Sequence, residues 1–298
     1  MRLDIGTAAK IVEPGVKAGF DKGLNAPGGD DWKRIAEDWT SNSKTETYPR
    51  LAPTGGVREW DSQREVRGAT QQYFTVENSM YEITHRVTWD MIRFDKLNQV
   101  NALAEGYGRQ MAKHPEKLLF ELLADAFTTA TYNGDDESYI VDTAHTDVGD
   151  GTLGNKGTTA LGVDSLAAAR IAGLKMKLPS GEPIMINYDL LVVGPDLAQT
   201  AYELTKPPKD PENANNTPNW HQGLDYIVNP HLTDTNDWFL LCTNQVFKPM
   251  AIQFVDRPTP MGIIQDKLLT DKFVDYGSHM YGKPTFTDWR LIYGASVT

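Results

Sequence analysis

Acidic side chains and a histidine gather in one stretch of the sequence, between residues 135 and 150. Asp142, His145 and Asp147 lie close together there, and carboxylate and imidazole groups are common ligands of divalent metals. The spacing does not match the calcium-binding loop of an EF-hand. One interpretation is therefore a cytoplasmic α+β metal-dependent hydrolase that uses these three side chains. The acidic members of the stretch are Asp135, Asp136, Glu137, Asp142, Asp147 and Asp150.

The sequence lacks the common motifs of catalytic and nucleotide-binding sites. The glycine-rich residues 149–159 resemble a phosphate loop, but Gly154 is followed by Asn155 and Lys156, so the required Gly-Lys-Ser/Thr is absent. The sequence contains no Gly-x-Ser-x-Gly, no His-Glu-x-x-His and no Gly-x-Gly-x-x-Gly after a strand. We therefore expect no catalytic residue, no metal and no cofactor. The histidines are scattered: His85, His114, His145, His221, His231 and His279.

Composition limits the class of protein. The chain has 298 residues and a formal net charge of −11, and such an acidic surface repels phosphate, which disfavours nucleic-acid binding as the main role. The single cysteine, Cys242, cannot form an intrachain disulfide and lies in an apolar run typical of a core. No apolar run approaches the length of a membrane span, and residues 1–10 lack the apolar segment of a secretory signal.

The longest helical pattern runs over residues 95–132, and other elements are expected to pack along it. Apolar residues recur there at spacings of three and four, so they share one face of a helix. Pro115 is expected to interrupt the hydrogen-bond ladder and to begin a second helix, and Asn133-Gly134 ends the pattern. We interpret this stretch as a structural spine that a sheet covers on one face.

Two segments before the spine have an unusual composition. Residues 1–43 are rich in glycine and proline, which predicts a loosely structured arm with one local helix from Asp30 or Asp31 to Trp39. Residues 44–80 are predicted to form an extended β-hairpin with dense mixed charge. Such a hairpin has too few apolar residues for its own core, so we expect it to lie on a neighbouring subunit. The predicted contact residues are Tyr48, Arg50, Arg58, Glu59, Trp60 and Arg64.

The remaining chain mixes strands and helices in irregular order, which indicates an α+β fold. Alternation around Tyr81 to Trp89 predicts a strand with His85 on its apolar side. A helix is predicted from about residue 164 to 176 with Leu166, Ala169, Ile171 and Leu174 largely inward. Further strands are predicted at 184–193, 226–228, 238–242, 251–255 and within 273–293, and a helix at 195–204.

The order of these parts resembles major capsid proteins of tailed bacteriophages, in particular the Mu-like major head subunits. The stretches that carry the resemblance are Tyr48 to Trp60 with Arg58-Glu59-Trp60, Tyr81-Glu82-Ile83 to Asp95, the turn, strand and helix from Leu178 to Leu204, Asn229-Pro230-His231-Leu232 before Asp237-Trp238-Phe239-Leu240, and Phe254-Val255-Asp256-Arg257-Pro258. They cover most of residues 44–295.

The resemblance implies the HK97-type capsid fold. On that fold, residues 1–43 become an N-terminal arm, 44–80 the extended loop, 81–177 the peripheral domain with the spine helix, 178–255 the axial domain, and 256–298 the return to the peripheral domain. The implied function is a non-catalytic shell subunit that assembles with copies of itself into pentamers and hexamers around the DNA genome, without sequence-specific DNA binding.

The resemblance also implies partners and a location. It implies a separate scaffolding protein and a portal as partners, and it leaves open whether a decoration protein binds outside. The expected location is the virion capsid, with assembly in the host cytoplasm and no membrane association. Within the same fold, the shell of a bacterial nanocompartment (an encapsulin-like protein) is an alternative function, and the metal-dependent hydrolase is a third.

Overall fold

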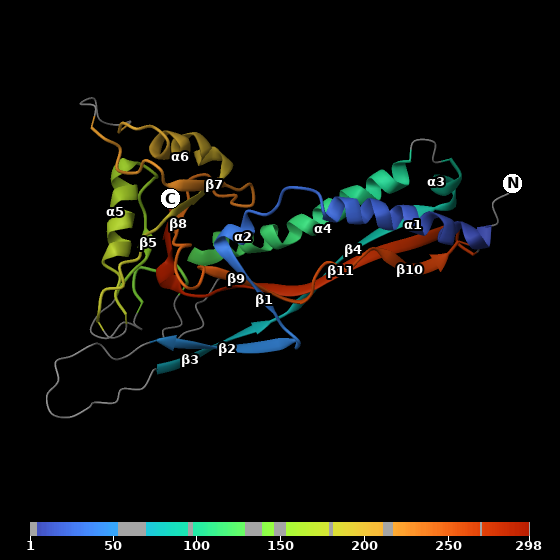
Figure 1. Ribbon diagram of the computed structural model, residues 1–298, viewed down its shortest axis with the longest axis horizontal. Helices are drawn as coiled ribbons and strands as arrows, with labels where there is room; N and C mark the ends of the chain where they lie inside the picture. Colours follow the sequence, from blue (N-terminus) through green and yellow to red (C-terminus); the bar gives the residue numbers. More distant parts are fainter. Residues whose placement is uncertain are drawn as a thin grey trace.

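The computed structural model describes residues 5–52, 70–94, 98–128, 139–145, 153–178, 181–210, 217–268 and 270–297, with the backbone alone at 5–11, 50–52 and 70–72. The molecule consists of an elongated body and a compact body at one end of it (Figure 1). The elongated body carries α1, α4 and the long strands β4 and β11, and the compact body carries α5 and α6. No helix in the described ranges is long and apolar enough to cross a membrane.

The first helix, α1 (Ile5–Leu24), corrects the predicted loose arm. It is a 20-residue helix that contains Pro14 and packs along α4. Gly15, Gly19 and Gly23 recur at a spacing of four and face α4, where an added Cβ at Gly23 would lie 2.0 Å from the Glu105 carbonyl oxygen. These glycines permit a close approach of two helix backbones, and that packing stabilises a segment whose composition alone favours a coil.

The spine helix, α4 (Gln99–Ala124), is shorter and more continuous than predicted. It contains Pro115 without a break, so the expected division into two helices is wrong. Pro115 is buried, and the packing of its ring offsets the hydrogen bond that its nitrogen cannot donate. A short 3₁₀ turn, η1 (Asp125–Phe127), follows. The predicted ends at 95–97 and 129–132 lie outside the described residues. The buried face of α4 comprises Val100, Ala104, Gly108, Met111, Pro115, Leu119, Phe120 and Leu123.

A five-stranded sheet supports the elongated body. Its order is β1 (Ala36–Thr40), β9 (Met250–Asp256), β11 (Phe273–Phe286) and β10 (Gly262–Lys267), and β4 (Ser79–Thr88) pairs with β11. The short helix α3 (Trp89–Phe94) follows β4. Only α2 (Trp32–Ile35) is helical in the segment predicted as helix up to Trp39, because the following residues pair in parallel with β9 as strand β1. The predicted inward histidine is confirmed, since His85 is buried.

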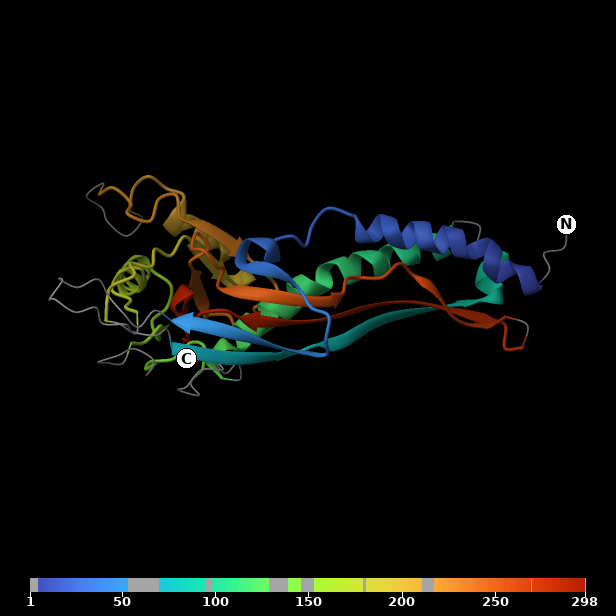
Figure 2. The same ribbon diagram turned by 60° about the horizontal axis from the view of Figure 1, so that its bottom comes forward.

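The predicted hairpin is confirmed at its base. Strands β2 (Thr45–Ala52) and β3 (Thr70–Glu77) pair antiparallel, from Thr45 opposite Glu77 to Ala52 opposite Thr70. Figure 2 shows β3 running on into β4 along the elongated body. The predicted tip between the two strands, residues 53–69, lies outside the described residues.

A second five-stranded sheet forms the centre of the compact body. Its order is β5 (Lys156–Gly157), β12 (Ile292–Ala295), β8 (Trp238–Leu241), β6 (Leu190–Val193) and β7 (Asp225–Val228). The strand predicted over 184–193 is confirmed only for its second half, β6. The first half follows a bent path in which Met185 has a positive φ of 51°. The predicted helix at 195–204 is confirmed as η2 (Pro195–Leu197) followed by α6 (Ala198–Thr205).

The helix predicted near 164–176 is α5 (Val163–Leu174). Leu166 and Ala169 are buried as expected, but Ile171 and Leu174 are 41% and 40% exposed, so the inward placement of those two is wrong. The helix ends two residues before Met176, which is itself buried.

Sheet membership departs from the predicted domain boundaries at three points. β5, which falls within the predicted peripheral segment 81–177, belongs to the compact sheet. β9, which falls within the predicted axial segment 178–255, pairs in the elongated sheet. β12, which falls within the predicted return segment 256–298, pairs with β5 and β8 in the compact sheet. The last strand of the chain therefore joins the compact body, and the chain crosses between the two bodies once more than expected.

Candidate functional site

The base of the β2–β3 hairpin is fixed to the elongated sheet by an aromatic cluster. The ring of Tyr48 lies 4.7 Å from that of Trp39 on β1 and 5.5 Å from that of Phe74 on β3. The Tyr48 hydroxyl donates a hydrogen bond to the Oε1 atom of Gln253, which is buried on β9. Tyr48, a predicted inter-subunit contact, is thus half-buried against its own chain.

Polar contacts close the same base. The buried Asn78 side chain donates to the Ser43 carbonyl at 2.9 Å, and its backbone N–H donates to the Lys44 carbonyl at 2.8 Å. The Ser41 hydroxyl donates to Glu46 at 2.9 Å, and hydrogen bonds from Ser41 and Ser43 lower the pKa of the Glu46 carboxyl. These hydrogen bonds join the segment that enters β2 to the residue that follows β3, so the two ends of the hairpin are held together.

An apolar groove lies between the hairpin base and the compact body. Its volume is about 760 Å³. At its rim, Val246 is 85% exposed and Phe247 is 60% exposed, in a loop between β8 and β9. Exposed apolar side chains beside an open groove indicate a surface that another chain can cover. Residues that line the groove include Trp39, Tyr48, Phe74, Ile184, Ile186 and Leu291.

The other predicted contact residues are not brought together by the described structure. Arg50 belongs to β2, but its side chain lies outside the described atoms. Arg58, Glu59, Trp60 and Arg64 all fall in the hairpin tip, outside the described residues. Their role in contacts between subunits stays a prediction.

The proposed metal-binding trio does not form a site in the described chain. The Asp142 carboxylate accepts hydrogen bonds from the backbone and hydroxyl of Thr143, at 2.6 and 3.2 Å. His145 is fully buried and stacks on Trp289, with ring centroids 3.9 Å apart. Asp147 lies outside the described residues. Among the residues described, no group of three or more His, Cys, Asp or Glu side chains could hold a metal ion.

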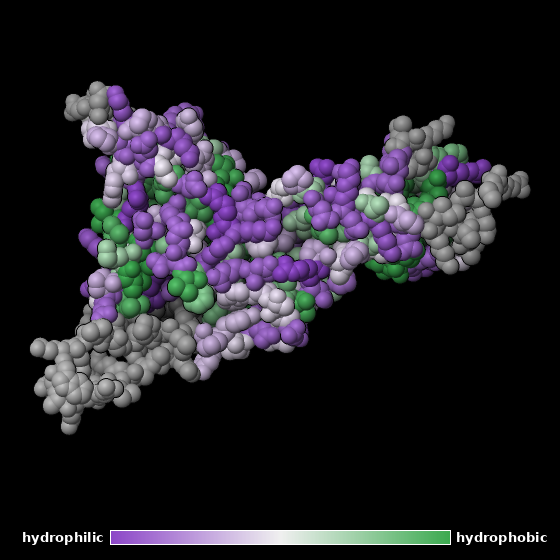
Figure 3. All heavy atoms as spheres, in the orientation of Figure 1, coloured by the Kyte–Doolittle hydropathy of each residue, from purple (hydrophilic) through white to green (hydrophobic). Residues whose placement is uncertain are grey.

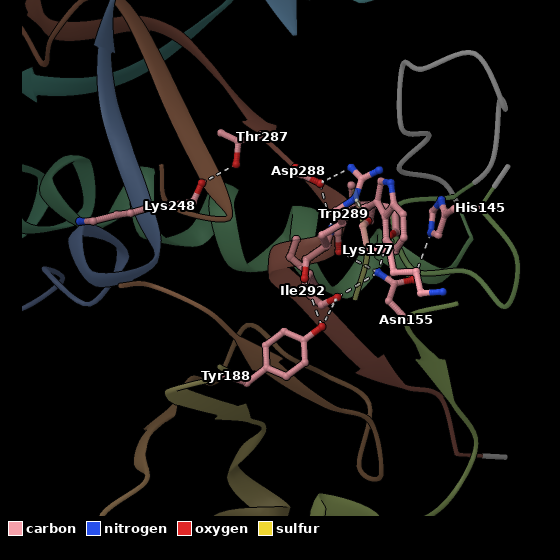
Figure 4. Close-up of polar contacts among 11 residues, drawn as sticks. His145, Asn155, Lys177, Tyr188, Lys248, Thr287, Asp288, Trp289 and Ile292 are labelled. Carbon is pink, nitrogen blue, oxygen red and sulfur yellow. Dashed lines mark hydrogen bonds and ion pairs between the residues drawn. The ribbon is translucent and has the colours of Figure 1, made fainter. Parts of the chain in front are cut away.

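His145 belongs instead to a structural polar cluster around Asn155 (Figure 4). The Asn155 amide nitrogen donates to the carbonyls of Ile140 at 2.9 Å, Trp289 at 3.0 Å and Ile292 at 2.9 Å. Its amide oxygen accepts from the Asp142 backbone N–H at 2.9 Å and lies 3.1 Å from the His145 Nε2 atom. One buried amide thus ties a loop to the C-terminal part of the chain. The segment that suggested a phosphate loop has a structural role here.

Cys242 is a core residue, as the sequence predicts. It is 1% exposed, and burial raises the pKa of its thiol. A raised pKa disfavours the thiolate, which is the nucleophilic form.

Sequence reasoning missed the groove and the outward apolar side of α5. The signal for the groove rim was present in the apolar pair Val246-Phe247 within an otherwise polar turn. The signal for α5 was the low polarity of the segment all round the helix, which periodicity arguments treat as deeper burial.

Comparison with known proteins identifies the family. The model of the family described as "Mu-like prophage major head subunit gpT" matches residues 10–160, which is half of the chain and extends from α1 to β5. The chain belongs to this family of major head subunits. A curated relative, the major capsid protein of Escherichia phage Mu, is 28% identical over 116 residues. That match covers 39% of this chain and only 37% of the relative.

Solved capsid structures share the fold of most of the chain. The capsid of bacteriophage JBD30 aligns with a TM-score of 0.55 at 14% identity, covering 91% of this chain and 65% of that one. A virus-like particle from Pyrococcus furiosus aligns with a TM-score of 0.54 at 9% identity, covering 96% of this chain and 98% of that one. The chain therefore has the α+β HK97-like capsid fold that the sequence predicts. It spans just under two thirds of the JBD30 subunit.

Proposed function

We propose that this head subunit assembles with copies of itself into pentamers and hexamers of an icosahedral shell that encloses phage or prophage DNA. The family match over residues 10–160 carries the proposal, together with a capsid fold that aligns over 91% of the chain. The hairpin supports it, because strands β2 and β3 pair along the elongated body and are anchored to its sheet through Tyr48 and Gln253 (Figure 1). An extension of this kind costs ordering entropy in a monomer and gains contacts in a lattice.

In this proposal, each of the two bodies corresponds to one domain of the capsid fold. The elongated body with α1, α4 and the β1–β9–β11–β10 sheet is the peripheral domain, and the compact body is the axial domain that meets its copies at the centre of each ring. Sheet membership supports 153–248 together with 289–297 as the axial part, in place of the range 178–255 expected from the sequence.

The protein acts by assembly and not by catalysis in this proposal. A scaffolding protein and a portal are its partners, it assembles in the host cytoplasm, and it ends in the virion. The net charge of −11 supports an inner wall that holds DNA without gripping phosphate. A strongly basic inner face in an assembled shell would contradict that part.

The decisive experiment is the native mass of the purified protein by light scattering, with negative-stain microscopy of the same sample. Rings of five or six or closed shells are expected, alone or on addition of the scaffolding protein. Trp60→Ala and Arg58→Glu in the hairpin tip should each leave a folded subunit that assembles poorly. Normal assembly of both variants would disprove the role of the hairpin tip.

A nanocompartment shell is the second candidate, favoured by the similarity to the virus-like particle from Pyrococcus furiosus, which extends over 98% of that chain. The contents of particles purified from the native host distinguish the two. DNA protected from nuclease supports the phage capsid, whereas an enclosed protein cargo supports the nanocompartment.

A further inference from the structure

Helix α5 presents apolar side chains on the side that faces away from its own body. Leu166, Ala169 and Gly173 are buried against the compact body, yet Ile171 and Leu174 on the other side are 41% and 40% exposed. Ala168 is exposed one turn before Ile171, and the charged Asp164 and Lys175 are exposed toward the two ends of the same side. Aliphatic side chains that remain exposed at the centre of a helix's outer side indicate a surface that a further partner can cover.

The position of α5 makes this surface accessible to another molecule. Figure 1 places α5 along the outer edge of the compact body, and Figure 3 shows hydrophobic surface along that same edge. We call Ala168, Ile171 and Leu174 the α5 face.

The adjoining side of the compact body carries α6, whose Tyr202 is 55% exposed. The chain after α6 links the two sides: Arg170 of α5 donates to the Trp220 carbonyl at 3.1 Å, and Asn219 donates to the Leu204 carbonyl at 2.8 Å. A head-to-tail ring needs two different surfaces on each copy, and here they lie on adjoining sides of the compact body.

We propose that the α5 face of one copy packs against the Tyr202 side of α6 in the next copy around a ring. This inference rests on the proposed function and names the surfaces through which the rings form. The contact is heterologous, because the two surfaces differ, and it gives a ring when the rotation from one copy to the next closes.

Charge on the two sides supports a second copy as the partner. Lys175 and Lys177 are exposed beside the C-terminal end of the α5 face. On the α6 side, the acidic Asp196 and Glu203 are exposed, and the basic Lys206 is exposed one turn after Tyr202. Opposite charges at the edge of a contact set its register and orientation.

The size of the α5 face also favours a repeated contact between copies. A helix of 12 residues is about 18 Å long, so one of its sides buries far less than the roughly 800 Å² per partner of a stable pairwise complex. Such a contact is weak alone and becomes strong when it is repeated around a closed ring.

Cysteine cross-linking tests the contact, since the only native cysteine is the buried Cys242. Subunits with Ile171→Cys are mixed with subunits carrying Tyr202→Cys, allowed to assemble, and treated with a short bismaleimide. We expect a mixed dimer in the mixture, no dimer from either variant alone, and a ladder up to the ring size from the double variant. The unmodified chain is the control.

A substitution test uses Ile171→Asp, which should reduce the assembled fraction about tenfold or more while circular dichroism stays unchanged. Ile264→Asp is the matched control, because Ile264 is 62% exposed on β10, far from α5. Cross-linking of Ile171→Cys subunits alone, or rings without a mixed cross-link, would overturn this inference and leave the shell function intact. Failure of the unmodified chain to form rings or shells would overturn both.

Discussion

His114 on α4 rests against Tyr81 on β4, with ring centroids 4.6 Å apart. A second pair has the histidine on the strand and the tyrosine on the helix: the ring centroids of His85 on β4 and Tyr107 on α4 lie 4.9 Å apart. Among the described residues, the buried Nε2 atoms of both histidines have no hydrogen-bond partner. Two contacts between a histidine ring and a tyrosine ring thus join the spine helix to β4 of the elongated body.

This arrangement predicts a loss of stability in acid. Burial lowers the pKa of both histidines below the ordinary 6.5, and Lys117 lowers that of His114 further while Glu121 opposes it. A lowered pKa means that the unfolded chain takes up the protons first, so this destabilisation begins as the pH falls through about 6.5. Urea midpoints at pH 7.5 and pH 5 measure it.

The double variant His85→Phe and His114→Phe should lessen this pH dependence. Burial also lowers the pKa of His221, which contributes part of the remainder. An equally steep loss of stability in the double variant would show that other groups cause it.

Close packing of α1 on α4 predicts a sharp contrast between two glycines of α4. A Cβ at Gly108 would lie 2.1 Å from the Phe20 carbonyl oxygen, whereas a Cβ at Gly106 meets nothing within 4 Å. Gly108→Ala should therefore cost about 1–3 kcal/mol of unfolding free energy. Gly106→Ala should stabilise the helix by up to about 1 kcal/mol. Chemical denaturation measures both, and limited proteolysis reports whether α1 detaches.

The Asn155 cluster predicts a large effect from one amide. Asn155→Ala leaves the carbonyls of Ile140, Trp289 and Ile292 without this donor in a fully buried place, which should cost about 2–4 kcal/mol. Asn244→Ala, at an exposed position in the loop after β8, should change stability by less than about 0.5 kcal/mol. Similar denaturation midpoints for both variants would contradict the structural role of Asn155.

The hairpin base predicts that one hydroxyl affects stability and assembly together. Tyr48→Phe removes the donor to Gln253, whose amide nitrogen already has no partner among the described residues. The expected cost is about 1–3 kcal/mol, with poorer assembly because the hairpin is less firmly directed. Tyr73→Phe on β3 is the control, since Tyr73 is 58% exposed. Melting temperature and assembled fraction are the two measurements.

Burial of Cys242 predicts an unreactive thiol. The native protein should react with a maleimide at least about a hundredfold more slowly than the urea-unfolded chain. Fast labelling of the native protein would show that the compact body opens readily, and it would also invalidate the cysteine cross-linking described above.

The sequence predicts those parts of the fold that local pattern determines. Alternation identifies β4, and the apolar pattern identifies α4 and the inward side of α5 at Leu166 and Ala169. Local composition fails where packing between distant segments decides the structure. The glycines of α1 indicate a coil until α4 is placed against them, and Trp39 joins a strand because β9 lies beside it.

The candidate site is predictable to a similar extent. The hairpin could be expected from its charges and aromatic residues, but the partner of Tyr48 could not, because Gln253 is about 200 residues away. His145 and Asp142 suggested metal ligands because carboxylates and imidazole lay near each other in sequence. In the structure, His145 stacks on the ring of Trp289, and its Nε2 atom lies within hydrogen-bond distance of the Asn155 amide oxygen. An outward Ile171 could not be distinguished from an inward one, because α5 carries aliphatic residues on both its buried and its exposed side.

The parallel pairing of β1 with β9 has a consequence for the order of events during synthesis. β1 ends at Thr40, and its partner begins at Met250, so most of the chain must leave the ribosome before the two can meet. The hairpin is anchored through Trp39 on β1 and Gln253 on β9, and hence it acquires its final direction only when translation is nearly complete. Contacts of long sequence separation form late. A nascent chain thus lacks the anchored base of the hairpin until most of its residues have been synthesised.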